Sequence, residues 1–344
     1  MDTLAISVVI PTHNRAALIT RAIVSALAAT KPCDEILVID DDSTDNTAQV
    51  LAQFGEKIRY IKIPHGGAGA ARNHGVAESK HSLVAFLDSD DEWFPDKLEL
   101  QRNVMQSWPH VAFCFSDFAV HDRSGRSIPH YLKNWHNDPR PWDQILGLGL
   151  HYSSIANLPA AREDFLMHIG DLYLPLMNRL YIGTFTLLFR KNFSGRTPVF
   201  PVDLPTYEDW QFFGELAKQG PGAYLDCETA IQHGHHLPRL TDANALVQAE
   251  TRIKILERVW GADPEFLLRH GNAYSRTIED QRRRNMFYAA KELLKAGKMT
   301  EARTAFADIA EYPGYYRILL HIPGRLVRSL IWLTQKLRAL IPAH

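Results

Sequence analysis

The sequence contains little cysteine and almost no excess charge, and both shortages limit what the protein can be. Three of its 344 residues are cysteines, Cys33, Cys114 and Cys227, and none has the close spacing of a zinc knuckle. We therefore expect a hydrophobic core in a reducing compartment and no disulfide framework. The formal net charge of −1 gives no overall field that would attract nucleic acid, so we expect no nucleic-acid partner.

Long apolar runs are lacking too. No stretch reaches the roughly 20 consecutive apolar residues that span a bilayer. Residues 4–10 resemble a short strand, without the basic flank or cleavage site of a secretory signal. The composition, 46% hydrophobic and 22% charged, is that of a soluble globular protein. We predict a cytoplasmic protein, and the length suggests about two domains of roughly 150 residues each.

Strand-like and helix-like segments alternate through the first hundred residues. Short β-branched or apolar runs predict strands at residues 6–10, 35–39, 58–63 and 83–87. Helical patterns follow the first two runs at residues 16–29 and 46–54, and Ser43 or Thr44 is expected to cap the second helix. This alternation predicts an α/β fold with a mostly parallel sheet and helices on both faces. Ligands of such sheets bind beyond the carboxyl ends of the strands.

Polar clusters follow three of these strands: THNR after the first, DDDSTD after the second and DSDD after the fourth. Each has an ordinary alternative. DDDSTD could be a capping turn, and a D-x-D triplet occurs about once by chance in a chain of this length. The segment GAGAAR resembles a dinucleotide fingerprint, but Arg72 replaces its third glycine, so we expect no nicotinamide cofactor. We expect this loop and Arg72 to face an anion at a helix N-terminus.

The acidic cluster suits a divalent cation. Asp90 and Asp91 offer hard oxygen ligands of the kind that Mg²⁺ or Mn²⁺ uses together with substrate phosphates. Asp40 or Asp41 could accept a hydrogen bond from a base or a ribose, and Arg72 could donate one to a base carbonyl or a phosphate. The three clusters together predict a site for a nucleotide diphosphate.

Five segments in order resemble the family-two inverting glycosyltransferases of the GT-A fold: ISVVIPTHNR (6–15), ILVIDDDSTDNT (36–47), GAARNHG (69–75), FLDSDDEW (86–93) and YEDW (207–210). The resemblance covers about residues 4–240. It implies a GT-A, Rossmann-like domain over 1–240, with a nucleotide-sugar-binding half at 1–118 and an acceptor-binding half at 119–240.

The resemblance also implies a role for each matching position. Asp209, with Glu208 beside it, would be the general base that deprotonates the acceptor hydroxyl, although acids at this place could also favour a helix N-terminus. Asp90 would bind the metal, with Asp91 as a second ligand. Contacts to the nucleotide sugar are implied for Pro11, Thr12, Asn14, Arg15, Asp40, Asp41, Arg72, Asp88, Ser89, Asp90, Gly183 and Thr184.

The sequence departs from the family pattern at several positions. His13 stands where tyrosine is common, and Asp42 stands where glycine is usual. A late polar contact to the metal or diphosphate falls in IQHGHHLPRLT, where three histidines are available. We favour His236 with Arg239 for both roles, and the choice among His233, His235 and His236 stays open.

The rest of the chain is less specific. Trp135, Trp142 and Tyr152 could stack on acceptor sugars or pack a small subdomain, and residues 181–190 predict a strand near the donor site. Residues 241–344 predict a helical region with two antiparallel helices joined at Gly297–Lys298. Residues 324–342 form an amphipathic stripe that could lie on a membrane surface or pack on protein.

The sequence therefore predicts a Mn²⁺- or Mg²⁺-dependent inverting glycosyltransferase. It would use a nucleotide-sugar donor, most simply a UDP-sugar, and a saccharide or lipid-linked saccharide acceptor. We expect it in the cytoplasm, peripheral at the inner face of the cell membrane. The alternatives are a sugar-phosphate nucleotidyltransferase and an inactive scaffold that binds a partner through its C-terminal helices.

Overall fold

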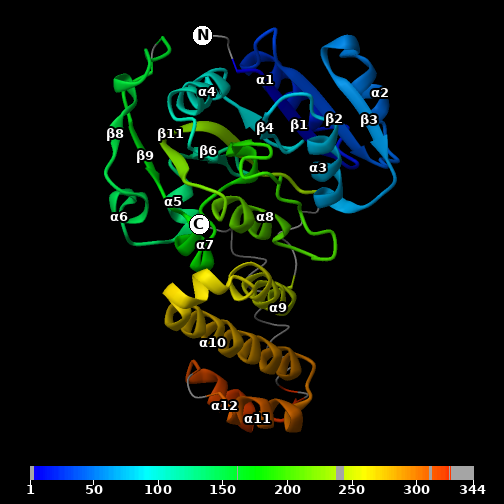
Figure 1. The fold of residues 1–344 in the computed structure, drawn as a ribbon. Coiled ribbons are helices and arrows are strands. Elements are labelled where there is room, and N and C mark those ends of the chain that lie inside the picture. The colour runs from blue at the N-terminus through cyan, green and yellow to red at the C-terminus, as the bar shows by residue number, and fades with distance from the viewer. Residues whose placement is uncertain (1–3, 161, 238–243, 310–311, 325, 327–344) are drawn as a thin grey trace. The chain divides into compact units, whose positions relative to one another are not determined.

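The computed structural model describes residues 4–326 except 161, 238–243, 310–311 and 325 (Figure 1). The chain forms two compact units. The first contains residues 1–204 and 208–239, and the second contains residues 205–207 and 240–344.

The N-terminal half of the first unit is a parallel sheet. Its strands are β1 (Ile6–Thr12), β2 (Glu35–Asp41), β3 (Arg59–Ile63) and β4 (Leu83–Phe86), in the order β3-β2-β1-β4. The intervening helices are α1 (Ile19–Ala29), α2 (Thr47–Ala52) and α3 (Gly67–Glu78). β1, β2 and β4 are buried along almost their whole length, which explains their apolar, β-branched sequences. The predicted strands and the polar clusters at their carboxyl ends are confirmed.

Beyond β4 the sheet becomes mixed, so the prediction of a mostly parallel sheet holds for the N-terminal half only. β10 (Leu188–Arg190) runs antiparallel to β4 and to β6 (Phe113–His121), and β11 (Gly222–His233) runs parallel to β6. β9 (Leu166–Gly170) and β8 (Leu150–His151) complete the main order. Two short strands lie off this path: β5 (Glu92–Trp93) pairs with β11, and β7 (Ser127–Ile128) pairs with β6.

Helices of the second half connect these strands (Figure 1). They are α4 (Lys97–Ser107), α5 (Leu132–His136), α6 (Trp142–Leu146), α7 (Tyr173–Asn178) and α8 (Glu208–Ala217). Two of the aromatic residues considered for sugar stacking pack inside the domain. Tyr152 is fully buried, and Trp142 stacks on Tyr224 with ring centroids 3.9 Å apart.

Two local predictions are wrong. Ser43 and Thr44 do not cap α2, whose N-cap is Asn46, because the Ser43 hydroxyl accepts a hydrogen bond from the Asn14 amide instead. Residues 181–190 do not form one strand. A 3₁₀ turn occupies Thr184–Thr186, and pairing with β4 begins only at Leu188.

The second unit is helical. It contains α9 (Ala245–Leu256), a π-helical turn (Glu257–Gly261), α10 (Pro264–Lys295), α11 (Met299–Ala307) and α12 (Tyr315–His321). The predicted turn between two helices is confirmed, and Gly297 adopts the positive φ of +74° that a helix end favours in glycine. A small core joins these helices: Ala290, Leu294, Ala302, Phe306, Ile309, Tyr316 and Leu320.

The structure describes only a small part of the predicted amphipathic helix at residues 324–342. Of the predicted helix 324–342, residues 325 and 327–342 lie outside the described part of the chain. Among the helices that the structure describes, none is both long enough and apolar enough to cross a membrane.

Candidate active site

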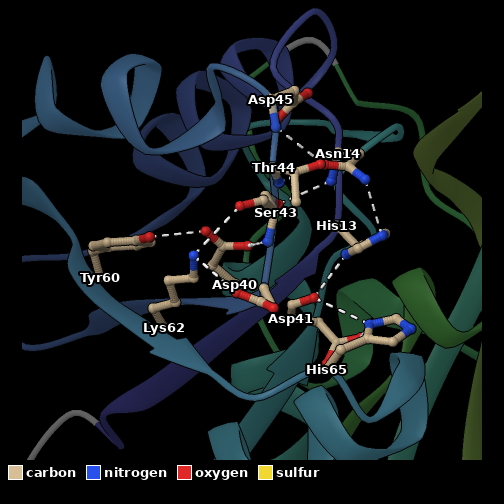
Figure 2. A network of polar contacts seen from close by, with 11 residues as sticks. His13, Asn14, Asp40, Asp41, Ser43, Thr44, Asp45, Tyr60, Lys62 and His65 are labelled. Atoms are coloured by element: carbon tan, nitrogen blue, oxygen red, sulfur yellow. Dashed lines mark hydrogen bonds and ion pairs between the residues drawn. The ribbon is translucent and has the colours of Figure 1, made fainter.

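Asn14 ties the loop after β1 to the loop after β2 (Figure 2). Its side-chain oxygen accepts hydrogen bonds from the Thr44 amide at 2.8 Å and the Asp45 amide at 3.3 Å. The backbone amide of Asn14 donates a hydrogen bond to Ser43 Oγ at 2.9 Å. Asn14 has a φ of +52°, which asparagine tolerates better than most residues. This residue therefore shapes the loop, and its implied contact with the nucleotide sugar stays a prediction.

The two aspartates that end β2 are buried, and their carboxylates accept hydrogen bonds from backbone amides of neighbouring loops. Asp40 accepts from the Ser43 amide and from the Tyr60 hydroxyl, each at 2.8 Å. Asp41 accepts from the amides of Gly66 and Gly67 at 2.7 and 2.8 Å. A carboxylate has about four lone-pair sites. Asp41 could therefore contact the base of a nucleotide and still accept the hydrogen bonds from Gly66 and Gly67.

Arg72, on α3, joins two segments that are distant in sequence. Its guanidinium donates to Asp88 at 2.8 Å, just beyond β4, and to Glu208 at 2.9 Å, at the start of α8. Its side chain is only 7% exposed. Burial opposes the charge of this guanidinium, but Asp88 and Glu208 outweigh that effect and raise the pKa of Arg72. The contact of Arg72 with the nucleotide stays a prediction; in the structure Arg72 holds two carboxylates of the site.

Asp209 lies in the first turn of α8, where its carboxylate has two different neighbours. Oδ1 accepts from the Trp210 amide at 2.8 Å, and Oδ2 accepts from the Thr184 hydroxyl at 3.3 Å. Burial raises the pKa of Asp209 to about 7, and the charge of the adjacent Glu208 adds to the effect. A carboxylate with such a pKa can take up a proton near neutral pH.

Asp90 sits among basic side chains. His235 Nε2 lies 2.7 Å from Asp90 Oδ2, and Arg15 Nε lies 4.0 Å from the same oxygen. Arg21 Nη2 donates to the Asp90 carbonyl at 2.7 Å. The Asp90 side chain is 18% exposed, so it is accessible as a ligand.

The structure favours His235 over the predicted His236. His236 is exposed, whereas His235 is buried against Asp90. Arg239 lies outside the described residues. The structure also gives Asp91 a different environment from Asp90, because Asp91 is 3% exposed and accepts from the His233 amide of β11 at 3.2 Å. Asp90 is thus the more accessible of the two carboxylates.

The remaining predicted residues line the same region. Pro11 and Thr12 end β1 opposite Ile39 and Asp40. Ser89 is buried between Asp88 and Asp90, and the Gly183 carbonyl accepts from the amide and hydroxyl of Thr186, both at 2.8 Å.

Sequence reasoning missed Arg21 and His65. Arg21 lies within the apolar pattern of α1, where no motif distinguishes it. His65 directly precedes the glycine pair that binds Asp41, and its Nδ1 lies 2.9 Å from Asp41 Oδ2. The position of His65 directly before this glycine pair was the only feature of the sequence that could have indicated its place in the site.

One further group of potential metal ligands lies among the described residues: His13, Asp41 and His65, with one ligand atom of each within 4.8 Å of the others (Figure 2). The Asn14 amide nitrogen lies 3.0 Å from His13 Nε2, which places the ring proton on Nδ1, facing the Asp41 carbonyl at 2.7 Å. A cation would have to displace that proton. The same is true at Asp90 and His235, because the 2.7 Å contact between Asp90 Oδ2 and His235 Nε2 also requires a proton between the two atoms, so the ring protons do not distinguish the two groups.

Residues 7–165 match the model of glycosyl transferase family 2. They belong to this family. An uncharacterized glycosyltransferase of Rickettsia felis is 29% identical over 219 residues, 63% of this chain and 32% of its own length. The Escherichia coli UDP-Glc:alpha-D-GlcNAc-diphosphoundecaprenol beta-1,3-glucosyltransferase WfgD is 34% identical over 122 residues, 35% of this chain and 48% of its own. The chain thus spans about a third to a half of the length of these relatives.

Solved structures show the same fold. Residues 1–349 of Staphylococcus aureus TarS, in complex with UDP-GlcNAc, superpose with a TM-score of 0.56 at 18% identity, over 85% of this chain and 81% of that fragment. The Pyrobaculum calidifontis mannosyltransferase PcManGT, in complex with GDP-Man and Mn²⁺, gives a TM-score of 0.51 at 15% identity, over 94% of this chain and 83% of its own. The family 2 domain therefore has the predicted GT-A fold.

Replacing Arg72 should strongly destabilise the family 2 domain. Arg72→Met leaves Asp88 and Glu208 without their shared cation, and loss of one partner from a buried ion pair costs about 3–5 kcal/mol. The free energy of unfolding from chemical denaturation measures this loss. Arg196→Met removes the partner of Glu215 from an exposed pair and should change the value by less than about 1 kcal/mol. Equal effects of the two substitutions would contradict the bridging role of Arg72.

Proposed function

We propose that this protein is a metal-dependent inverting glycosyltransferase that transfers a sugar from a UDP-sugar to a saccharide or lipid-linked saccharide. The observation that carries the proposal is the single acidic centre built by Asp88, Asp90, Glu208 and Asp209 around Arg72. Within it, Asp90 faces a histidine and two arginines, and Asp209 is a carboxylate whose pKa lies near neutrality. A cation ligand and a proton acceptor are the two groups that the reaction requires.

Asp209 acts as the general base in this proposal. The acceptor hydroxyl oxygen attacks the anomeric carbon of the donor and gives its proton to Asp209. At the same time the bond from that carbon to the diphosphate oxygen breaks, and its electron pair leaves with the diphosphate. Thr184 keeps one carboxylate oxygen of Asp209 oriented. A single displacement of this kind inverts the anomeric configuration and needs no covalent intermediate.

The donor set at Asp90 fits Mn²⁺ or Mg²⁺. A carboxylate oxygen such as Asp90 Oδ2 is a usual ligand of Mn²⁺ and Mg²⁺, and the imidazole nitrogen His235 Nε2, which lies 2.7 Å from it, is a second donor. When bound there, the cation would neutralise the charge that develops on the leaving diphosphate. Arg15 adds positive charge beside Asp90. Asp90 with His235 is thus the pair that would hold the cation.

The donor and acceptor classes rest on the relatives. WfgD is named for UDP-Glc and for a diphosphoundecaprenol-linked sugar, and one TarS structure contains UDP-GlcNAc. These names support a UDP-sugar donor and a lipid-linked acceptor. An acceptor of this kind would suit a cytoplasmic enzyme that works peripherally at the inner face of the cell membrane. The family 2 match favours glycosyl transfer over nucleotidyl transfer, and the intact acidic centre argues against an inactive scaffold.

Asp209→Asn should reduce turnover of the productive UDP-sugar by about 10² to 10⁴-fold, the usual contribution of a general base. UDP release in the presence of Mn²⁺ and a set of saccharide acceptors measures the rate. Asp263→Asn is the matched control, because Asp263 also lies at a helix N-terminus, where it caps α10, and belongs to the second unit. If Asp209→Asn retains full turnover, or if the wild-type protein consumes no UDP-sugar, the proposal fails.

The activity should fall on the acid side of neutrality. A general base works in its ionised form, so kcat/KM should decline as the pH falls through the pKa of Asp209, at about 7. Glu208→Gln removes a negative charge that raises this pKa and should move the decline to lower pH. Glu215→Gln, on the same helix, should leave the profile unchanged. A profile in which Glu208→Gln moves the decline upward would contradict the assignment of Asp209 as the base.

A further inference from the structure

The turn that presents Thr184 to Asp209 is held by side chains from another part of the chain. The backbone of Thr184–Thr186 forms a 3₁₀ turn instead of continuing the strand that the sequence predicts. The carbonyls of Phe185 and Thr186 therefore need partners other than a neighbouring strand. Trp93 and Gln101 supply them.

Trp93 occupies β5, immediately after the acidic cluster. Its indole Nε1 donates to the Phe185 carbonyl at 2.6 Å, and its side chain is almost fully buried. Its own amide donates to Ser25 Oγ at 3.1 Å, on α1. Trp93 is thus anchored both at its backbone and at its indole, and the indole cannot turn away from the Phe185 carbonyl without breaking a buried hydrogen bond.

Gln101, on α4, bonds the next carbonyl. Its Nε2 donates to the Thr186 carbonyl at 2.7 Å and to the Cys114 carbonyl at 3.3 Å. Lys97 determines which way this amide faces, because Lys97 Nζ donates to Gln101 Oε1 at 2.6 Å while lying 4.3 Å from the centre of the Trp93 ring. With its oxygen taken by Lys97, the amide of Gln101 must direct its nitrogen at the turn.

We propose that Trp93 and Gln101 are positioning residues that lock the turn Thr184–Thr186 and so keep the Thr184 hydroxyl on Asp209. Neither side chain touches the reacting groups. Both act through two consecutive backbone carbonyls and then through the hydrogen bond from Thr184 Oγ1 to Asp209 Oδ2 at 3.3 Å. The catalytic consequence rests on the proposed function, but the effect on the Asp209 carboxyl does not.

The test measures the titration of Asp209 itself, without substrate. Carboxyl ¹³C signals of the aspartate-labelled protein are followed against pH, and Asp209→Asn identifies the signal. A hydrogen bond donated to a carboxylate favours its ionised form. Thr184→Val should therefore raise the pKa of Asp209 by about half a unit to one unit, a size typical of one hydrogen bond to a charged group.

Trp93→Phe should raise the same pKa in the same direction, because the turn loses its anchor while the aromatic ring is kept. Gln101→Met provides a second variant in case the first fails to fold. In the double variant Trp93→Phe/Thr184→Val the shift should be no larger than in Thr184→Val alone, since residues that act in series are not additive. Trp142→Phe, which alters a ring that stacks on Tyr224, is the matched control and should cause no shift.

The proposal is overturned if folded Trp93→Phe and Gln101→Met both leave the Asp209 titration unchanged while Thr184→Val shifts it. Shifts that add fully in the double variant would overturn it as well. Turnover is the second readout, and we expect kcat to fall about tenfold to a hundredfold with the KM for the donor unchanged. If the wild-type protein transfers no sugar, the proposed function fails, and the titration still decides the positioning role.

Discussion

The acidic centre of this protein depends on the buried guanidinium of Arg72. Asp88, Glu208 and Asp209 come from two separate segments, and three carboxylates so close together would repel each other strongly in a partly desolvated site. Arg72 bonds two of them directly and lowers the cost of ionising the third. Because its partners follow β4 and begin α8, the same side chain also ties the N-terminal half of the domain to its C-terminal half.

The carboxylates of the site divide into those that build it and those that are available for chemistry. Asp40 and Asp41 are buried and bonded to backbone amides, so they stabilise the loops around the site. Asp90 and Asp209 are only partly satisfied by protein groups and differ in their surroundings. The Asp90 carboxylate has His235 and Arg15 beside it, while Arg21 bonds the Asp90 main-chain carbonyl. Asp209 is buried beside Glu208, and both the burial and the neighbouring charge raise its pKa.

Local sequence was enough to predict the strands of the N-terminal half and the polar clusters at their ends. Each buried strand is a short apolar run, and in a parallel sheet its carboxyl end must lie at the ligand edge. Contacts between distant segments were beyond this kind of reasoning. Arg72 and Glu208 are 136 positions apart, and nothing near either residue indicates the other. The choice of His235 over His236 depends on which way one residue faces after β11 ends. The turn Thr184–Thr186 lies within a segment that resembles a strand in sequence, but Trp93 and Gln101 bond the carbonyls of Phe185 and Thr186 in place of a neighbouring strand.

The central claim is that the ligand edge of this sheet binds a nucleotide diphosphate through a cation held at Asp90. Calorimetric titration of the purified protein with UDP, with and without Mn²⁺, tests it most directly, with GDP and TDP for comparison. We expect UDP to bind in the presence of Mn²⁺ and to bind at least about tenfold more weakly without the cation or in Asp90→Asn. UDP binding that is indifferent to both Mn²⁺ and Asp90, or no binding of any of the three nucleotides, would contradict the account.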